Sequence, residues 1–378
     1  MFRLLRRTLL QDRGRTVLSI LVVAAAIALV LVFEGFRVGL YAQVRSFPQG
    51  LPADLVAAQT GVSNILGARS VLPQSARAEV EAVPGVKVAH PLGGMPVIYS
   101  RGDESSPIYV VAYDTAGGPR HLVTGHEIAD KDEIVVDAAL ARKYGFTSGD
   151  GVEFLGHTFK IAGLSADGTN FFDPYVFARL EDVVDLYLAG DLPEELATNA
   201  ALSFLLIELE RGADRDAVRA EIERTVPSVD VFTPAELGAN DVRRAQGFMG
   251  PPLNLLVVIA YVVGVLLVGL TLYASVLARM REFGIMKAIG TSGRRLGRAV
   301  IGEALVVSTL ALAIGTAMAV GLAHLIRWAM PMYLVDPLEL HVLARTTMGA
   351  GLMACLGALL PIHRVAAVDP ASVFKQWE

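Results

Sequence analysis

Cysteine is almost absent from this sequence, with one residue, Cys355, among 378. A disulfide within the chain is therefore excluded, so any exported part must fold on its own hydrophobic core. Lysine is also scarce: there are six, and none is followed by serine or threonine. A phosphate-binding P-loop requires that lysine–hydroxyl pair, so this chain does not hydrolyse nucleotide by itself.

Motifs for catalysis and for metal binding are missing as well. The sequence contains neither His-Glu-x-x-His nor Gly-x-Ser-x-Gly. The closest histidines are His121 and His126, which have no evident further ligands, so solvated loop histidines are the simpler interpretation. The basic residues gather beside apolar segments rather than on a nucleic-acid-binding motif. We therefore expect no catalytic residue, no metal site and no nucleic-acid partner.

Hydrophobic residues are abundant, at 53% of the chain, and they are concentrated in four runs. A helix needs roughly 20 apolar residues to cross a hydrocarbon core of about 30 Å. Three of the runs carry no charge, and the third along the chain carries one carboxylate, Glu303. Two short runs are extended by a few residues to reach this length. The sequence thus predicts transmembrane helices at 17–39, 253–278, 299–326 and 341–362.

The first run has a competing interpretation, a cleaved secretory signal peptide. Its apolar stretch is longer than the hydrophobic region of a usual signal peptide. The sequence also continues with helical periodicity through EGFRVGLYAQV, beginning at Glu34. These two features favour a retained helix.

Charge predicts the orientation of the helices. Residues 1–16 carry five basic and one acidic side chain, and residues 279–298 carry six and one, whereas residues 37–250 carry 18 and 30. Positively charged flanks stay in the cytoplasm, so both basic segments are expected there and the acidic segment outside. We therefore expect a cytoplasmic N-terminal segment 1–16, an extracytoplasmic domain 40–250, a cytoplasmic loop 279–298, an outer loop 327–340 and a cytoplasmic tail 363–378.

The segment 40–250 has the pattern of an α+β domain. Short runs rich in Val, Ile and Tyr predict strands at 86–90, 95–100 and 107–114. Residues 131–164 predict a strand, a short helix, a turn at Gly149–Gly151 and two strands paired across Gly156-His157. The fold class is therefore an α-helical membrane protein with four transmembrane helices and an α+β extracytoplasmic domain between helices 1 and 2.

A second unit is expected after Pro193. It comprises a strand at 202–210, an amphipathic helix at 214–225 and a returning strand at 228–233, in a small sheet with the helix on one face. The Gly250-Pro251-Pro252 triplet is expected to stop any helix just before the second span.

Small residues recur four positions apart in the last two spans, where they let helix backbones approach closely. In an alanine-rich chain some of this spacing arises by chance. The expected packing positions are Ala311, Gly315 and Ala319 on the third span, and Ala350, Ala354 and Ala358 on the fourth.

Ionisable residues in the spans lie near their ends. Glu34 and Arg37 flank the outer end of the first span, and His324 and Arg327 that of the third. Glu303 lies about one turn inside the cytoplasmic end of the third, where a helix N-terminus favours a carboxylate. An ion-coupled carrier needs polar groups near the membrane midplane, so this class of transporter is disfavoured.

The loop RMREFGIMKAIGTSGRRLGR, residues 279–298, predicts a short surface helix over 281–289 that stops at Gly290. Its apolar residues Phe283, Met286 and Ile289 are expected on one side. On periodicity alone, a helix that only rests on lipid headgroups is the favoured explanation of this pattern.

The same residues resemble the signature of the FtsX/MacB-type permeases of ABC transporters. In that family the loop has the form Arg-x-x-Glu-x-Gly-x-x-(Lys/Arg)-Ala-x-Gly, followed by a Glu-Ala pair in the third helix. The C-terminal PIHRVAAVDPASVFK also resembles the family's ending, at Pro361, Arg364, Asp369, Pro370 and Ala371. The matching residues of the loop and third helix are Arg279, Glu282, Gly284, Lys287, Ala288, Gly290, Glu303 and Ala304.

The resemblance implies that the loop is a coupling helix that docks on a separate ABC ATPase subunit. ATP and Mg²⁺ would be bound by that partner, with no cofactor in this chain. It also implies a second permease copy as a homodimer, contact with membrane lipids and a bacterial inner membrane location, and it leaves a periplasmic adaptor and an outer-membrane channel open. The implied coupling residues are Arg281, Glu282, Phe283, Gly284, Ile285, Met286, Lys287, Ala288, Ile289 and Gly290.

Three functions follow as hypotheses. The leading one is a non-catalytic permease subunit that transmits ATP-driven motion to its outer domain and exports or extracts lipid, lipoprotein, peptide or drug. Within the family, the text GFRVGLYAQV and the chain length are most similar to the DevC-like branch. The alternatives are an FtsX-like signalling subunit that activates a cell-wall hydrolase, and a membrane-anchored sensor without an ATPase.

Overall fold

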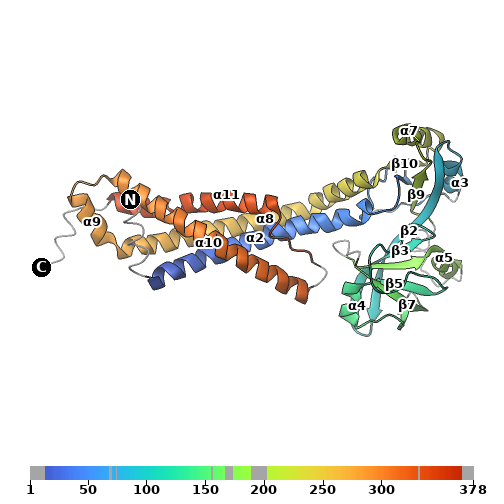
Figure 1. Ribbon diagram of the computed structural model, residues 1–378, viewed down its shortest axis with the longest axis horizontal. Helices are drawn as coiled ribbons and strands as arrows, with labels where there is room; N and C mark the ends of the chain where they lie inside the picture. Colours follow the sequence, from blue (N-terminus) through green and yellow to red (C-terminus); the bar gives the residue numbers. More distant parts are fainter. Residues whose placement is uncertain are drawn as a thin grey trace. The chain divides into compact units, whose positions relative to one another are not determined.

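The computed structural model describes residues 13–67, 70–73, 75–154, 156–166, 173–188, 202–330 and 333–367. The chain divides into two compact units (Figure 1). The helical unit comprises Met1–Gly39 and Met249–Glu378, and the sheet unit comprises Leu40–Phe248. Asp369, Pro370 and Ala371 of the predicted family ending lie outside the described residues.

Four long helices in the described part of the chain are apolar enough to cross a membrane. Outward-facing leucines such as Leu266 and Leu270 are about two-thirds exposed, as expected of side chains that meet lipid rather than water. The helices are α2 (Arg13–Gln49), α8 (Pro234–Ala278), α10 (Gly293–Ala329) and α11 (Leu340–Gly357), and the shorter α9 (Met280–Ala288) and α12 (Leu359–Ala367) accompany them.

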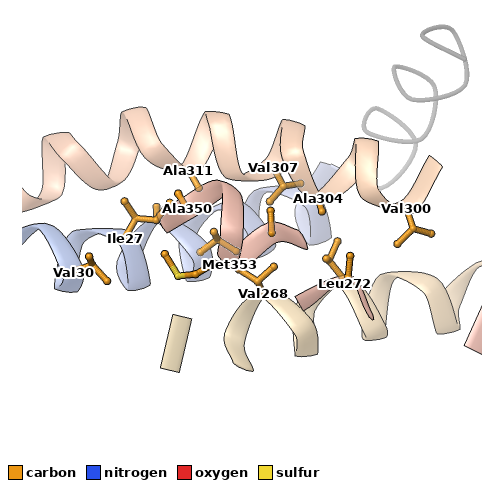
Figure 2. Packing of buried hydrophobic residues seen from close by; sticks show 14 of the residues in the cluster. Ile27, Val30, Val268, Leu272, Val300, Ala304, Val307, Ala311, Ala350 and Met353 are labelled. Atoms are coloured by element: carbon orange, nitrogen blue, oxygen red, sulfur yellow. The ribbon is translucent and has the colours of Figure 1, made fainter. Parts of the chain in front are cut away.

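The helical unit has one apolar core. Figure 2 shows side chains of α2, α8, α10 and α11 that meet in it, among them Ile27, Val268, Val307 and Met353. Alanines and valines dominate this core, and such small side chains allow close helix packing where hydrophobic association is weak.

The expected stop at Gly250-Pro251-Pro252 is wrong, because α8 runs through all three residues. Proline fixes φ near −65°, which is already a helical value. Its cost to a helix is the missing N–H donor and the contact of its ring with the preceding turn. The uncharged run from Leu253 continues the helix, because a backbone in lipid must satisfy its own hydrogen bonds.

The described residues of the sheet unit form a ten-stranded mixed sheet. Its main path is β10-β1-β9-β2-β3-β8-β5-β7-β4, and β6 pairs with β7 off this path. The strands are β1 (Leu55–Gln59), β2 (Val86–Arg101), β3 (Glu104–Tyr113), β4 (Leu122–Gly125), β5 (Glu133–Asp137), β6 (Gly151–Phe154), β7 (His157–Ser165), β8 (Tyr175–Arg179), β9 (Phe204–Leu209) and β10 (Val229–Phe232); the helices are α3 (Ser75–Glu81), α4 (Ala138–Tyr144), α5 (Leu180–Leu188) and α7 (Arg215–Thr225).

Two sequence predictions about this sheet are wrong. The strands expected at 86–90 and 95–100 are one strand, β2, which pairs with β9 up to Leu92 and with β3 from Leu92 onward. The separate sheet expected after Pro193 does not exist among the described residues, because β9 and β10 flank β1 in the common sheet. Both errors come from long-range pairing, which local patterns do not encode.

Other sheet predictions are confirmed. β6 and β7 form the expected hairpin, closed by the pair Phe154 and His157. Helix α7 begins after Asp214, whose carboxylate accepts hydrogen bonds from the first-turn N–H groups of Asp216 and Ala217. An α+β domain thus stands between the first and second long apolar helices, and the predicted fold class is confirmed.

Glu133 at the start of β5 makes the sheet unit sensitive to acid. Its side chain is buried and accepts hydrogen bonds from the N–H groups of Ala129 and Asp130, both at 3.2 Å, and from the Lys160 ammonium at 3.1 Å. Burial alone would raise the pKa of this carboxyl, but these three donors hold the pKa below its ordinary value of 4.5.

We expect Glu133→Gln to destabilise the sheet unit by about 1.5 kcal/mol at neutral pH, because the charge-assisted bonds are lost. A lowered pKa in the folded state gives stability that is present above the unfolded value of 4.5 and disappears as the pH falls below it. The difference between variant and wild type should therefore shrink in acid. Amide hydrogen exchange of β5 in the full chain measures it; the exposed Glu104→Gln is the control, and a pH-independent difference would contradict the assignment.

Candidate functional site

The candidate site is the turn from α8 through α9 into α10. Helix α8 ends at Ala278, and Arg279 leaves helical geometry at φ −114° and ψ 17° before α9 begins at Met280. Gly290 follows α9 with a φ of +93°, a left-handed conformation that glycine adopts without strain. Helix α10 then begins at Gly293. The chain thus changes direction twice over about fifteen residues, once between α8 and α9 and once between α9 and α10.

An ion pair holds this turn together. The Arg279 guanidinium donates from Nη2 to both carboxylate oxygens of Glu303, at 2.5 and 2.6 Å. The Ser275 hydroxyl joins the pair, accepting from Arg279 at 2.6 Å and donating to Glu303 at 3.0 Å. Both charged side chains are mostly buried, at 19% and 12% exposure. The end of α8 is thus bonded to the side of α10.

Glu303 does not lie where the sequence placed it. The expected position was one turn inside the third helix, but α10 begins at Gly293, so Glu303 is almost three turns in. At that depth the helix N-terminus contributes little to its charge, since the effect fades after the first turn. The Arg279 guanidinium is therefore what stabilises this carboxylate.

One side of α9 is anchored in the helical core. Phe283 is 6% exposed and belongs to the same core cluster as Leu296 and Val300 of α10. Gly284 is buried next to it, and Met286 packs against the cluster. These residues attach α9 firmly to the helices on either side of it.

The other side of α9 is open. Glu282 and Ile285 are exposed, and Ile289 is 79% exposed. The expectation that Phe283, Met286 and Ile289 share one face is wrong for Ile289, because α9 ends at Ala288 and Ile289 lies in the turn. The surface available to a partner carries a carboxylate and two isoleucines. Of the other predicted coupling residues, Arg281 and Ala288 are also exposed and Lys287 is half-buried.

The predicted packing residues all lie inside the helical unit, where they are buried; their energetic role stays a prediction. A Cβ at Gly315 would stand 2.7 Å from the Ala24 carbonyl oxygen, so α10 and α2 nearly touch there. The sequence missed a second close approach, at which a Cβ on Gly357 would stand 2.9 Å from the Gly269 nitrogen. The buried residues are Ala311, Gly315, Ala319, Ala350, Ala354 and Ala358.

The sequence also did not show that Glu34 is buried and forms ion pairs. The Glu34 side chain on α2 is 1% exposed and pairs with Arg37 at 2.6 Å and with Arg345 on α11 at 3.3 Å. Arg37 also donates to the Asn254 side chain on α8 at 3.1 Å. The sequence shows each charge, but nothing in it indicates that residues 34 and 345 meet. This cluster joins three helices of the unit.

No cluster of three or more potential metal ligands occurs among the described residues. His126 is exposed and its Nδ1 lies 2.7 Å from the backbone oxygen of Glu127, as expected for a loop histidine.

Family comparison assigns both halves of this architecture. The model of the MacB-like periplasmic core domain matches residues 16–225, more than half of the chain. The model of the FtsX-like permease C-terminal domain matches residues 254–370, which include α9 and the Arg279–Glu303 pair. The chain belongs to the FtsX/MacB family of ABC transporter permeases. The resemblance seen in the loop motif is thereby confirmed.

Relatives of this permease span nearly its whole length. An uncharacterized ABC transporter permease of Mycobacterium tuberculosis is 26% identical over 366 residues, and one of Mycobacterium bovis is 27% identical over 373, with 96% of each chain covered in both cases. Among solved structures, the extracellular domain of the noncanonic ABC-type transporter YknZ from Gram-positive bacteria aligns with a TM-score of 0.36 and 14% identity, over 48% of this chain and all of that one. The periplasmic region of MacB from Actinobacillus actinomycetemcomitans aligns with a TM-score of 0.36 and 10% identity, over 51% and 94%.

Proposed function

We propose that this permease converts ATP-driven motion of a separate ATPase subunit into movement of its sheet unit outside the membrane. The ATPase would dock on the exposed side of α9 and bind ATP and Mg²⁺. Two permease copies would pair with two ATPases, with the termini and the 279–298 loop in the cytoplasm of a bacterial inner membrane. The cargo class is a lipid, lipoprotein, peptide or drug outside the cytoplasm.

The observation that carries the proposal is the two-sided build of α9. Its inner side is fixed by Phe283 in the core and by the adjacent Arg279–Glu303 pair. Its outer side presents Glu282, Ile285 and Ile289. A force applied to the outer side reaches α8 and α10 through packed side chains and an ion pair, which transmit rigid-body motion rather than absorbing it.

The helices supply the path from the membrane to the outside. Helix α8 contributes residues to both units, and so does α2. Long continuous helices carry displacement along their axes without needing a polar pathway between them. The ion pairs of the helical unit, Arg279–Glu303 and the Glu34 cluster, bind helices to one another and so stiffen the unit.

Copurification tests the proposal directly. Gentle solubilisation of the chain from its native membrane should bring an ABC ATPase with it. Reproducible absence of an ATPase, together with unaltered function after disruption of the loop, would exclude the proposal. Recovery of a cell-wall hydrolase bound to the sheet unit would instead favour the signalling function.

Glu282→Lys and Gly290→Pro are each expected to reduce permease-stimulated ATP hydrolysis by at least about tenfold while leaving membrane insertion intact. Charge reversal at Glu282 alters the exposed side of α9, and proline cannot adopt the φ of +93° at Gly290. ATPase assays of the reconstituted complex measure the effect. Glu104→Lys, an equal charge change on an exposed residue of the sheet unit, is the control. Wild-type stimulation in both loop variants would refute docking at α9.

A further inference from the structure

The sheet unit contains a groove of about 770 Å³ between the outer half of β2 and the short strand β6. Val97–Arg101 of β2 and the adjoining Gly102 line one wall, and Asp150–Phe154 line the other, with Phe146 beside them. The floor is aromatic: the ring centroids of Tyr99 and Phe154 lie 6.4 Å apart, and those of Tyr99 and Phe146 lie 6.0 Å apart. A volume of this size is in the range that holds a ligand.

Both walls are strand edges. Up to Leu92, β2 pairs with β9, and from Leu92 to Arg101 it pairs with β3 on its other side. Among the described residues, the edge of β2 beyond Leu92 on the β9 side therefore has no partner strand. Among the described residues β6 pairs only with β7. An unpaired edge presents a row of N–H and C=O groups that can bond another strand.

The register shows which backbone groups of β2 face the groove. Arg101 and Glu104 close a two-residue hairpin loop, so they form a hydrogen-bonded pair, and alternate residues back along β2 bond to β3. The residues between them, including Ile98 and Ser100, point their N–H and C=O groups the other way. Pro96 also falls in this set, where its missing N–H costs the ladder with β3 nothing.

The same argument applies to β6. Phe154 and His157 close a two-residue loop, so Phe154 and Val152 bond to β7. The Asp150 carbonyl accepts from the Ile161 N–H of β7, which agrees with this alternation. Gly151 and Glu153 therefore direct their backbone groups to the groove. Two rows of backbone donors and acceptors border the same cavity.

We propose that this groove binds an extended, basic segment of a partner protein outside the membrane, by addition of a β-strand. An extended chain bonds an exposed sheet edge through its backbone and places alternate side chains on opposite faces. Here the side chains on one face would meet the aromatic floor. Those on the other would lie beside Ile98, which is 72% exposed.

Charge selects a basic occupant. The groove's charged residues are Arg101, Asp150 and Glu153. The Arg101 guanidinium is already engaged, donating to the Tyr144 carbonyl at 2.7 Å and lying 5.4 Å from the centre of the Phe146 ring. The Asp150 carboxylate accepts hydrogen bonds from the Thr147 N–H at 2.7 Å and from the Thr147 hydroxyl at 2.9 Å. Glu153, which is exposed, is therefore the carboxylate that faces a ligand, and Asp150 adds its negative charge beside it. Residues 37–250 as a whole carry 30 acidic and 18 basic side chains, which would steer a basic segment toward this unit.

The test uses the full-length permease in lipid nanodiscs and a short labelled peptide of alternating lysine and valine. Fluorescence anisotropy should show saturable binding, with a peptide carrying glutamate in place of lysine binding at least about tenfold more weakly. Ile98→Pro removes a groove-facing N–H while sparing the ladder with β3, and should weaken binding about fivefold. Ile98→Val keeps the N–H and should bind like wild type. Glu153→Gln should weaken binding of the lysine peptide alone.

Amide hydrogen exchange tests directly whether the edge of β2 is unpaired. Without peptide, the amides of Ile98 and Ser100 should exchange much faster than those of Val97 and Tyr99, and peptide should slow them. Slow exchange of Ile98 and Ser100 in the free permease would mean that another segment of the chain already pairs there, which overturns the proposal. Absence of saturable binding, equal binding by Ile98→Pro, or equal affinity for both peptides would overturn it as well.

Discussion

Glu303→Ala is expected to destabilise the helical unit by about 3 kcal/mol. The substitution leaves the Arg279 guanidinium mostly buried without its carboxylate, and an uncompensated buried charge is among the most damaging single changes. The expected loss of stability lies at the low end for buried ion pairs because both side chains keep some contact with solvent, at 19% and 12% exposure. Unfolding of the full chain in detergent, followed by circular dichroism, measures the loss.

A charge swap separates the ion pair from general damage at this position. The double variant Arg279→Glu/Glu303→Arg restores opposite charges and should recover part of the stability lost in either single variant. Glu282→Ala is the matched control, because Glu282 is an exposed glutamate on the adjoining helix and its removal should change stability by less than about 0.5 kcal/mol. Equal stability of Glu303→Ala and wild type would show that the pair does not hold α8 to α10.

Glu282 and Glu303 are thus expected to differ in kind, although both belong to the same sequence motif. Glu282 lies on the open side of α9, so its substitution should affect coupling to the ATPase and leave stability almost unchanged. Glu303 acts inside the helical unit, so its substitution should reduce stability first. Measuring both properties in both variants separates docking from transmission.

The parts of the fold that the sequence predicted well are those set by local chemistry. Uncharged apolar runs indicate the membrane helices, because a helix of that composition satisfies its own backbone in lipid. The hairpin across Gly156-His157 was predictable because a tight turn brings adjacent strands together. The helix at 214–225 was predictable from the helical spacing of its apolar residues, and the structure adds the capping bonds of Asp214.

The errors arose where distant residues decide the structure. The change of partner along β2 depends on β9, which lies more than a hundred residues away in the sequence. The proline pair in α8 was expected to end a helix, yet the helix continues through both prolines into the apolar run that follows them. The motif named Arg279 and Glu303 together, but only the structure shows that they bond across 24 residues. Local periodicity contains none of this information.

The strongest packing test concerns the closest approach of α2 and α10. Gly315→Leu is expected to destabilise the helical unit by about 2–3 kcal/mol, because its Cβ would stand 2.7 Å from the Ala24 carbonyl oxygen and 3.1 Å from the Ile27 Cβ. The obstruction is helix backbone, which cannot rotate away as a side chain can. Helices in lipid associate mainly through such close packing, so separating them forfeits much of their attraction.

The same helix offers a control that reverses the expected sign. Gly321 lies on the exposed side of α10, with nothing within 4 Å of a Cβ placed there. Intrinsic helix propensity favours alanine over glycine by about 1 kcal/mol, so Gly321→Ala should be neutral or stabilising. Gly315→Ala gains the same propensity but meets the Ala24 carbonyl, and should therefore destabilise. Detergent unfolding of the two variants in parallel decides between packing and propensity, and two changes of the same sign would refute the contact between α2 and α10.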